Sequence, residues 1–110
     1  MKVKKQTPET ILKNQAKDYL TLHGWFHFPY PAGVMGHKGA CDRIAIKNRV
    51  VLFLEFKSKQ GILSDKQVKF QEDITSHGGI YLVVRSIEEL ELWTKQIYEI
   101  ISQTSQAFSN

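Results

Sequence analysis

The sequence predicts one α/β domain, with helices packed on a mixed sheet in the order α-β-β-β-α-β-α. Two unbroken apolar runs, 50–54 and 80–84, are typical of strands that are covered on both faces. Because the intervening segment 64–78 has a helical pattern, its crossover predicts that these two strands are parallel. The 110 residues are 42% hydrophobic, which suffices for one domain over 1–110 with its core at about 7–101.

The first helix is predicted to begin after Thr7. Thr7 is a suitable N-cap, Pro8 suits the first helical position, and Glu9 places an anion in the first turn. Apolar residues then follow a roughly helical spacing as far as Gly24, which ends the helix.

Three strands are predicted to follow. A short aromatic strand at 25–28 is followed by a glycine-rich loop. The segments 42–46 and 50–56 are apolar and close enough in sequence to form a hairpin. Its turn contains either the two residues 48–49 or the three residues 47–49.

The second half of the chain is predicted to be helix, strand, helix. Ser64 and Gln67 have the spacing of a capping box, which predicts a helix from Ser64 to the glycine pair further on. A buried strand at 80–85 follows, and a capped amphipathic helix occupies 86–101. The remaining segment 102–110 is polar, and we expect a frayed tail there.

Composition excludes several classes of protein. Aromatic residues make up 11% and charged residues 24% of the chain, which are globular values and not those of a disordered chain. The apolar runs are too short to span a membrane, and none follows the basic N-terminus as in a signal peptide. A single cysteine forms no internal disulfide. We therefore expect a soluble, cytoplasmic protein with no membrane partner.

Positive charge is concentrated in the first half of the chain. Residues 1–60 contain 11 of the 15 Lys and Arg residues and carry a net charge of +7, whereas 61–110 carry −3. A basic half suits a polyanionic partner such as nucleic acid. A solvated, lysine-rich surface explains the same charge equally well.

Glu55 and Lys57 end the most apolar strand. Because side chains alternate along a strand, the two lie on one face, with Phe56 on the other. The ends of strands in α/β sheets are common ligand sites. A strand that simply emerges into solvent has the same pattern.

Asp42 strengthens the prediction of a functional site at this strand end. With a two-residue turn it lies directly opposite Glu55, and with a three-residue turn it is still adjacent. Facing carboxylates repel each other, and a divalent cation between them removes that repulsion. Together with the backbone carbonyl of Phe56 they match the oxygen ligands of Mg²⁺ or Mn²⁺. Beside such an ion, Lys57 can orient an attacking water or meet charge developing on a phosphate.

Four segments resemble, in order and spacing, the motifs of one nuclease family. They are GACD at 39–42, EFK at 55–57, GILSDKQ at 61–67 and GGIYLVV at 78–84. The family is the virus-type replication-repair nuclease (VRR-NUC) family of the PD-(D/E)xK nuclease superfamily, and the resemblance extends over about 7–95. It implies a restriction-endonuclease-like core, which agrees with the predicted order of elements.

The resemblance also implies roles for individual residues. Asp42 and Glu55 would bind Mg²⁺ or Mn²⁺, and Lys57 would assist the nucleophilic water. Gln67 would be the helical glutamine near the site, although the third residue of a capping box can serve as a cap alone. Members of the family carry a glutamate on the first helix, for which Glu9 is the candidate.

The implied function is that of a metal-dependent DNA endonuclease that hydrolyses backbone phosphodiesters. Stand-alone members resemble Holliday-junction resolvases, so we expect a homodimer that acts on branched DNA. The alternatives are a flap or restriction-type nuclease with the same fold, and a DNA-binding module without catalysis. Recognition through shape and phosphates is expected. Candidate phosphate contacts are Lys38, Lys59, Lys66 and Lys69.

Neither the histidines nor the cysteine predicts a metal site of another kind. The four histidines lack the spacing of metal ligands, and one cysteine does not complete a structural zinc site. Cys41 is expected to be a small packed residue on the face of the sheet opposite to Asp42.

Overall fold

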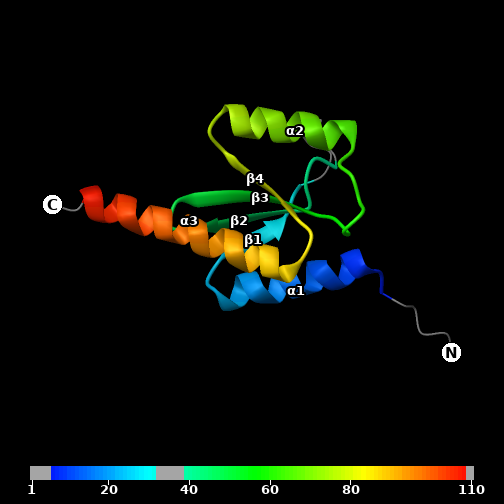
Figure 1. Cartoon of the computed structure of the whole chain (residues 1–110), viewed down its shortest axis with the longest axis horizontal. Coiled ribbons are helices and arrows are strands. Elements are labelled where there is room, and N and C mark those ends of the chain that lie inside the picture. Colours follow the sequence, from blue (N-terminus) through cyan, green and yellow to red (C-terminus); the bar gives the residue numbers. More distant parts are fainter. Residues whose placement is uncertain (1–5, 32–38, 109–110) are drawn as a thin grey trace.

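The computed structural model of the protein describes residues 6–31 and 39–108, with side chains as far as Gln103. In this part of the chain, three helices and four strands follow one another in the predicted order, α-β-β-β-α-β-α (Figure 1). The elements are α1 (Pro8–Leu22), β1 (Phe26–Pro29), β2 (Arg43–Lys47), β3 (Val50–Phe56), α2 (Asp65–Ser76), β4 (Ile80–Val84) and α3 (Ile87–Phe108).

The four strands form one mixed sheet in the order β1-β2-β3-β4. β1 pairs with β2 and β2 with β3 in antiparallel fashion, whereas β3 and β4 are parallel. Lys47 faces Val50 across a two-residue turn, in which Asn48 and Arg49 have φ angles of 49° and 73°. Two positive φ values are what a tight hairpin turn requires. The shorter of the two predicted turns is therefore present, and the predicted parallel pair is confirmed.

Helices cover both faces of the sheet (Figure 1). α1 and α3 lie on one face and α2 lies on the other. Residues of β3 alternate between these layers: Leu52, Leu54 and Phe56 enter the larger core with α1 and α3. On the other face, Phe53 packs against the smaller core beneath α2.

The smaller core is largely aromatic. Phe70 of α2 meets the rings of Phe53, Tyr30 and Tyr81 edge to face, with centroids 5.6 to 6.1 Å apart. Ala40 and Cys41 are buried in the same cluster. This packing holds the segment before β2 against the sheet, directly beside the strand end that carries the candidate site.

The N-caps predicted for α1 and α2 are both present. Thr7 Oγ1 accepts the backbone N–H of Thr10 at 3.2 Å. Ser64 and Gln67 form a reciprocal capping box at the start of α2. Local side-chain chemistry therefore determines where these two helices begin.

Several predicted boundaries differ from the structure, most of them by one residue, as at β1 (predicted 25–28) and β4 (predicted 80–85). β2 begins at Arg43, because the Asp42 side chain replaces a backbone partner in the ladder. The last helix was predicted to end near 101, but α3 continues to Phe108. The added residues include no glycine or proline, so nothing interrupts propagation of the helical hydrogen bonds. Among the helices of the described ranges, none combines the length and apolarity that a membrane span requires.

Candidate active site

Asp42 and Glu55 lie side by side at the end of β3. The pairing of β2 with β3 ends at Arg43 opposite Leu54, which places Asp42 opposite Glu55. The Asp42 N–H donates to the Leu54 carbonyl at 2.8 Å, and its Oδ2 accepts the Phe56 N–H at 2.8 Å. Asp42 therefore bonds to the residues on both sides of Glu55.

Glu55 is a buried acid with only 3% of its surface exposed. Its Oε2 accepts a hydrogen bond of 2.7 Å from Gln67 Nε2. Burial, together with the hydrogen bond and negative charge of Asp42, raises the pKa of Glu55 to about 8, and the positive charges of Lys57 and Lys13 oppose this increase. The pair is thus short of positive charge, which a proton or a metal ion can supply.

Gln67 joins the helix cap to the site. Its Oε1 accepts the Ser64 N–H at 2.9 Å, while its Nε2 donates to Glu55. Since the amide oxygen is engaged by the cap, the amide nitrogen is directed at the carboxylate. The two interpretations of Gln67, as a cap and as a neighbour of the site, therefore describe the same geometry.

Two lysines supply the positive charge around the carboxylates. Lys57 is half-buried, lines a surface hollow of about 370 Å³ and acts electrostatically on Glu55. Lys13 of α1 places its Nζ 3.5 Å from Asp42 Oδ1. Sequence reasoning missed Lys13. The available signal was its position one turn after Glu9, on the same face of the helix.

Glu9 lies in the first turn of α1. The residue of α1 that contacts Asp42 is Lys13, one turn further along the helix. In residues 6–31 and 39–108, no three His, Cys, Asp or Glu side chains are grouped closely enough to hold a metal ion together. The acidic part of the site is therefore the pair Asp42 and Glu55.

Two further residues support the site from neighbouring elements, and sequence reasoning missed both. The Tyr81 hydroxyl donates to the Ala40 carbonyl at 2.9 Å and holds the segment before Asp42. Arg85 Nη1 donates to the carbonyls of Ser58 and Gly61, each at 2.7 Å. Arg85 directly follows β4, whose last residue pairs with Phe56. The predicted parallel pairing places the end of β4 beside the end of β3, so Arg85 could have been expected near the segment after Phe56.

The four lysines expected at DNA differ in their surroundings. Lys59 and Lys66 are exposed. Lys69 is exposed as well, but its Nζ lies 3.1 Å from Asp73 Oδ1, one turn further along α2. Lys38 lies outside the described residues.

Cys41 is a packing residue, as expected. It is buried among Phe70 and Tyr81 beneath α2, whereas the neighbouring Asp42 reaches Lys13 of α1. Burial, followed by the negative charges of Glu55 and Asp42, raises the pKa of the Cys41 thiol to about 12. The thiol is therefore neutral at physiological pH and unsuited to nucleophilic chemistry.

The oxygen donors at the strand end suit a hard divalent cation. Asp42 Oδ2 already accepts the Phe56 N–H, so Oδ1, next to the carboxylate of Glu55, has more lone-pair capacity for a cation. In an antiparallel pair the N–H and C=O of a residue point to the same neighbour, so the Phe56 carbonyl leaves the strand on the side of Asp42. One or two carboxylates, a carbonyl and water form a usual Mg²⁺ environment in proteins.

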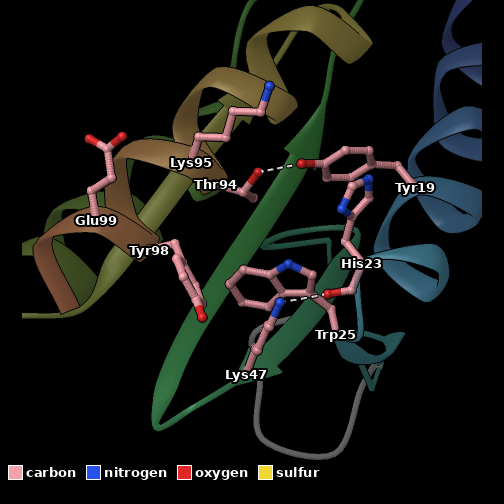
Figure 2. A pocket seen from close by; sticks show the side chains of 8 residues that line it. All are labelled: Tyr19, His23, Trp25, Lys47, Thr94, Lys95, Tyr98 and Glu99. Atoms are coloured by element: carbon pink, nitrogen blue, oxygen red, sulfur yellow. Dashed lines mark hydrogen bonds between the residues drawn. The ribbon is translucent and has the colours of Figure 1, made fainter. Parts of the chain in front are cut away.

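A second hollow, of about 300 Å³, lies at the hairpin end of the sheet between α1 and α3 (Figure 2). Lys47 Nζ donates to the His23 carbonyl at 2.7 Å. It also lies 6.0 and 5.2 Å from the ring centroids of Trp25 and Tyr98. The ammonium is thus satisfied by a carbonyl and two aromatic faces. These contacts of Lys47 join the hairpin to the helices. The length of β3 separates them from Glu55.

Fold and site together define a small α/β domain with a carboxylate pair and lysines at the end of its central strand. A solved structure described as "VRR_NUC domain" has the same fold, with a TM-score of 0.72 and 21% sequence identity over 82% of this chain and 97% of that chain. No sequence model of a protein family and no curated protein matches the chain. The protein therefore has the fold of a VRR_NUC domain. This confirms the predicted fold class and the fold that the resemblance of the four motifs implied.

Proposed function

We propose that this protein is a divalent-metal-dependent DNA endonuclease. The observation that carries the proposal is the convergence of Asp42 and Glu55, with Lys57 and Lys13 as the neighbouring cations. A pair of facing carboxylates destabilises a sheet when no cation lies between them, and a domain that only binds DNA does not need such a pair. The VRR_NUC fold supports the same class of function.

Asp42, Glu55 and the Phe56 carbonyl would hold Mg²⁺ or Mn²⁺. When bound, such an ion polarises a phosphoryl oxygen and makes a neighbouring water more acidic. Gln67 keeps the Glu55 carboxylate in a single orientation through its 2.7 Å hydrogen bond. Lys57, on the open side of the site, faces the negative charge that develops on the phosphate and orients the attacking water. Glu9, in the first turn of α1, would be a further ligand of the ion.

We propose branched DNA as the preferred substrate and a homodimer as the active form. Lys38, Lys59, Lys66 and Lys69 would contact backbone phosphates, which favours recognition of shape over sequence. A chain of 110 residues offers little surface for gripping a junction, and a two-fold dimer doubles it. α3 supports an interface, since Leu92, Trp93 and Ile100 are exposed on it.

The test is a cleavage assay with labelled four-way junction, flap and linear duplex DNA. We expect Mg²⁺-dependent cleavage of the junction that stops with chelator, and a loss of about 100-fold or more in Asp42→Asn and Lys57→Met. Lys95→Met is the matched control, because this lysine lies at the remote hollow. Sedimentation of the same preparations should give the mass of two chains.

Each alternative predicts a different result. Cleavage in the presence of chelator would contradict metal dependence. Duplex cut as fast as junction would contradict the substrate preference, and faster cleavage of the flap would identify the flap-type enzyme. Tight DNA binding with no cleavage of any substrate would identify the module without catalysis.

A further inference from the structure

We propose that Lys13 is an exchangeable counter-cation of the active site. In the metal-free protein it neutralises Asp42, and when a divalent cation binds it leaves Asp42 and faces the substrate phosphate. The inference rests on the proposed metal site and assigns to it a residue that lies outside the four motifs.

The geometry of Asp42 makes the two cations competitors. Its Oδ2 already accepts the Phe56 N–H at 2.8 Å, so Oδ1 is the oxygen with more lone-pair capacity left for a cation. Lys13 Nζ lies 3.5 Å from that same atom. Two positive charges this close to one oxygen repel each other, so binding of the second requires departure of the first.

Lys13 is placed so that it can leave. Its side chain is 37% exposed, and a long flexible stem carries the ammonium from the surface of α1. It is also near enough to act on Glu55, so its charge belongs to the whole carboxylate pair. Once displaced, the ammonium remains at the rim of the site, where a polyanionic substrate approaches.

Lys17 provides the matched control. It lies one helical turn after Lys13 on the same helix and carries the same charge, but it is exposed, and its charge acts on His27. Replacement of either lysine by methionine keeps the stem and the helix propensity and removes one positive charge. Only Lys13→Met removes the competitor at Asp42.

The first measurement is titration of the chelator-treated 110-residue chain with Mn²⁺ alone, in which electron paramagnetic resonance reports free Mn²⁺. We expect Lys13→Met to bind Mn²⁺ roughly fivefold more tightly than the wild type, because a cation next to the binding oxygen is gone. Lys17→Met should differ from the wild type by less than about twofold. A purely structural role of Lys13 predicts weaker binding in the variant or no change.

The second measurement is junction cleavage at saturating Mg²⁺. Here Lys13→Met should lower kcat/KM by about tenfold, since one phosphate contact is lost, and Lys13→Arg should restore most of it. Tighter Mn²⁺ binding combined with slower cleavage is the signature of the exchange. Unchanged or weaker Mn²⁺ binding in Lys13→Met overturns the inference and leaves the metal site intact. Absence of Mn²⁺ binding by the wild type overturns the metal site and this role of Lys13 together.

Discussion

Glu55 is a carboxylate at a position where the metal-free fold favours a neutral group. It is buried, it faces Asp42, and the amide of Gln67 that donates to it carries no charge. Burial of a charge without full compensation costs stability. Positions that break a local rule in this way are typically functional sites, which is consistent with metal binding as the purpose of Glu55.

The pH dependence of stability tests this description of Glu55. The pKa of its carboxyl is about 8 in the folded protein against an ordinary 4.5, so the folded state binds the proton more tightly than the unfolded state. The stabilisation that the proton provides is therefore complete at low pH and is lost as the pH rises through the folded value. In chelator, Glu55→Gln should be more stable than the wild type by about 1–3 kcal/mol at pH 8.5, with a much smaller difference at pH 5.

Urea unfolding at the two pH values measures the difference. Glu72→Gln, on the exposed side of α2, is the control and should show no such pH dependence. If the gap between the wild type and Glu55→Gln did not widen with pH, the carboxyl would not be destabilised in the fold.

At the scale of elements, the site depends on connections between strands and helices. The segment after β3 contains Ser58 and Gly61, whose carbonyls converge on Arg85 at the end of β4. The Lys57 N–H donates to the Val84 carbonyl at 3.0 Å. Because β3 and β4 are parallel, their ends lie side by side. The hydrogen bonds of Arg85 therefore hold the loop that follows Lys57.

Arg85→Met should loosen this loop. A charged donor to two carbonyls is removed, so we expect a loss of about 1–3 kcal/mol in the free energy of unfolding. Faster hydrogen exchange confined to 57–63 and about tenfold slower cleavage should accompany it, because Lys57 is less well placed. Arg49→Met, in the hairpin turn at the other end of the sheet, is the control and should leave the exchange of this loop unchanged.

At the scale of the whole molecule, the two ends of the sheet have different roles. The carboxylate pair lies where β3 ends, while the hairpin end is tied to α1 and α3 around the hollow in Figure 2. There the Thr94 hydroxyl donates to the Leu90 carbonyl, so Tyr19 is the donor in its 2.8 Å bond to Thr94. This bond joins the first helix to the last.

Tyr19→Phe tests the separation of the two ends. The ring stays in the core and Thr94 keeps its bond to Leu90, so the expected loss is about 1 kcal/mol, the value of one hydrogen bond. Thermal unfolding should detect it, while junction cleavage at a temperature where both proteins are folded should be unchanged. A large loss of cleavage in this variant would show that the α1–α3 contact, and not only the strand end, controls the site.

Sequence patterns alone determined most of the architecture. Apolar runs, caps and breakers act over a few residues, so they predicted every element, the hairpin, the parallel pair and the approach of Asp42 to Glu55. Alternation along β3 predicted which of its side chains share a face. The pattern did not discriminate between the two possible hairpin turns. The positive φ values of Asn48 and Arg49 in the structure identify the two-residue turn.

Tertiary structure decided which side chains from distant elements meet. Lys13 reaches Asp42, Tyr81 reaches Ala40 and Arg85 reaches the loop after β3 only because α1 and β4 dock in one particular position. Docking depends on the packing of whole faces, for which no local pattern exists, since many placements of an amphipathic helix bury similar apolar area. The sequence by itself therefore determined the fold, the carboxylate pair and the neighbouring Lys57, and only the packed molecule brought Lys13, Tyr81 and Arg85 to them.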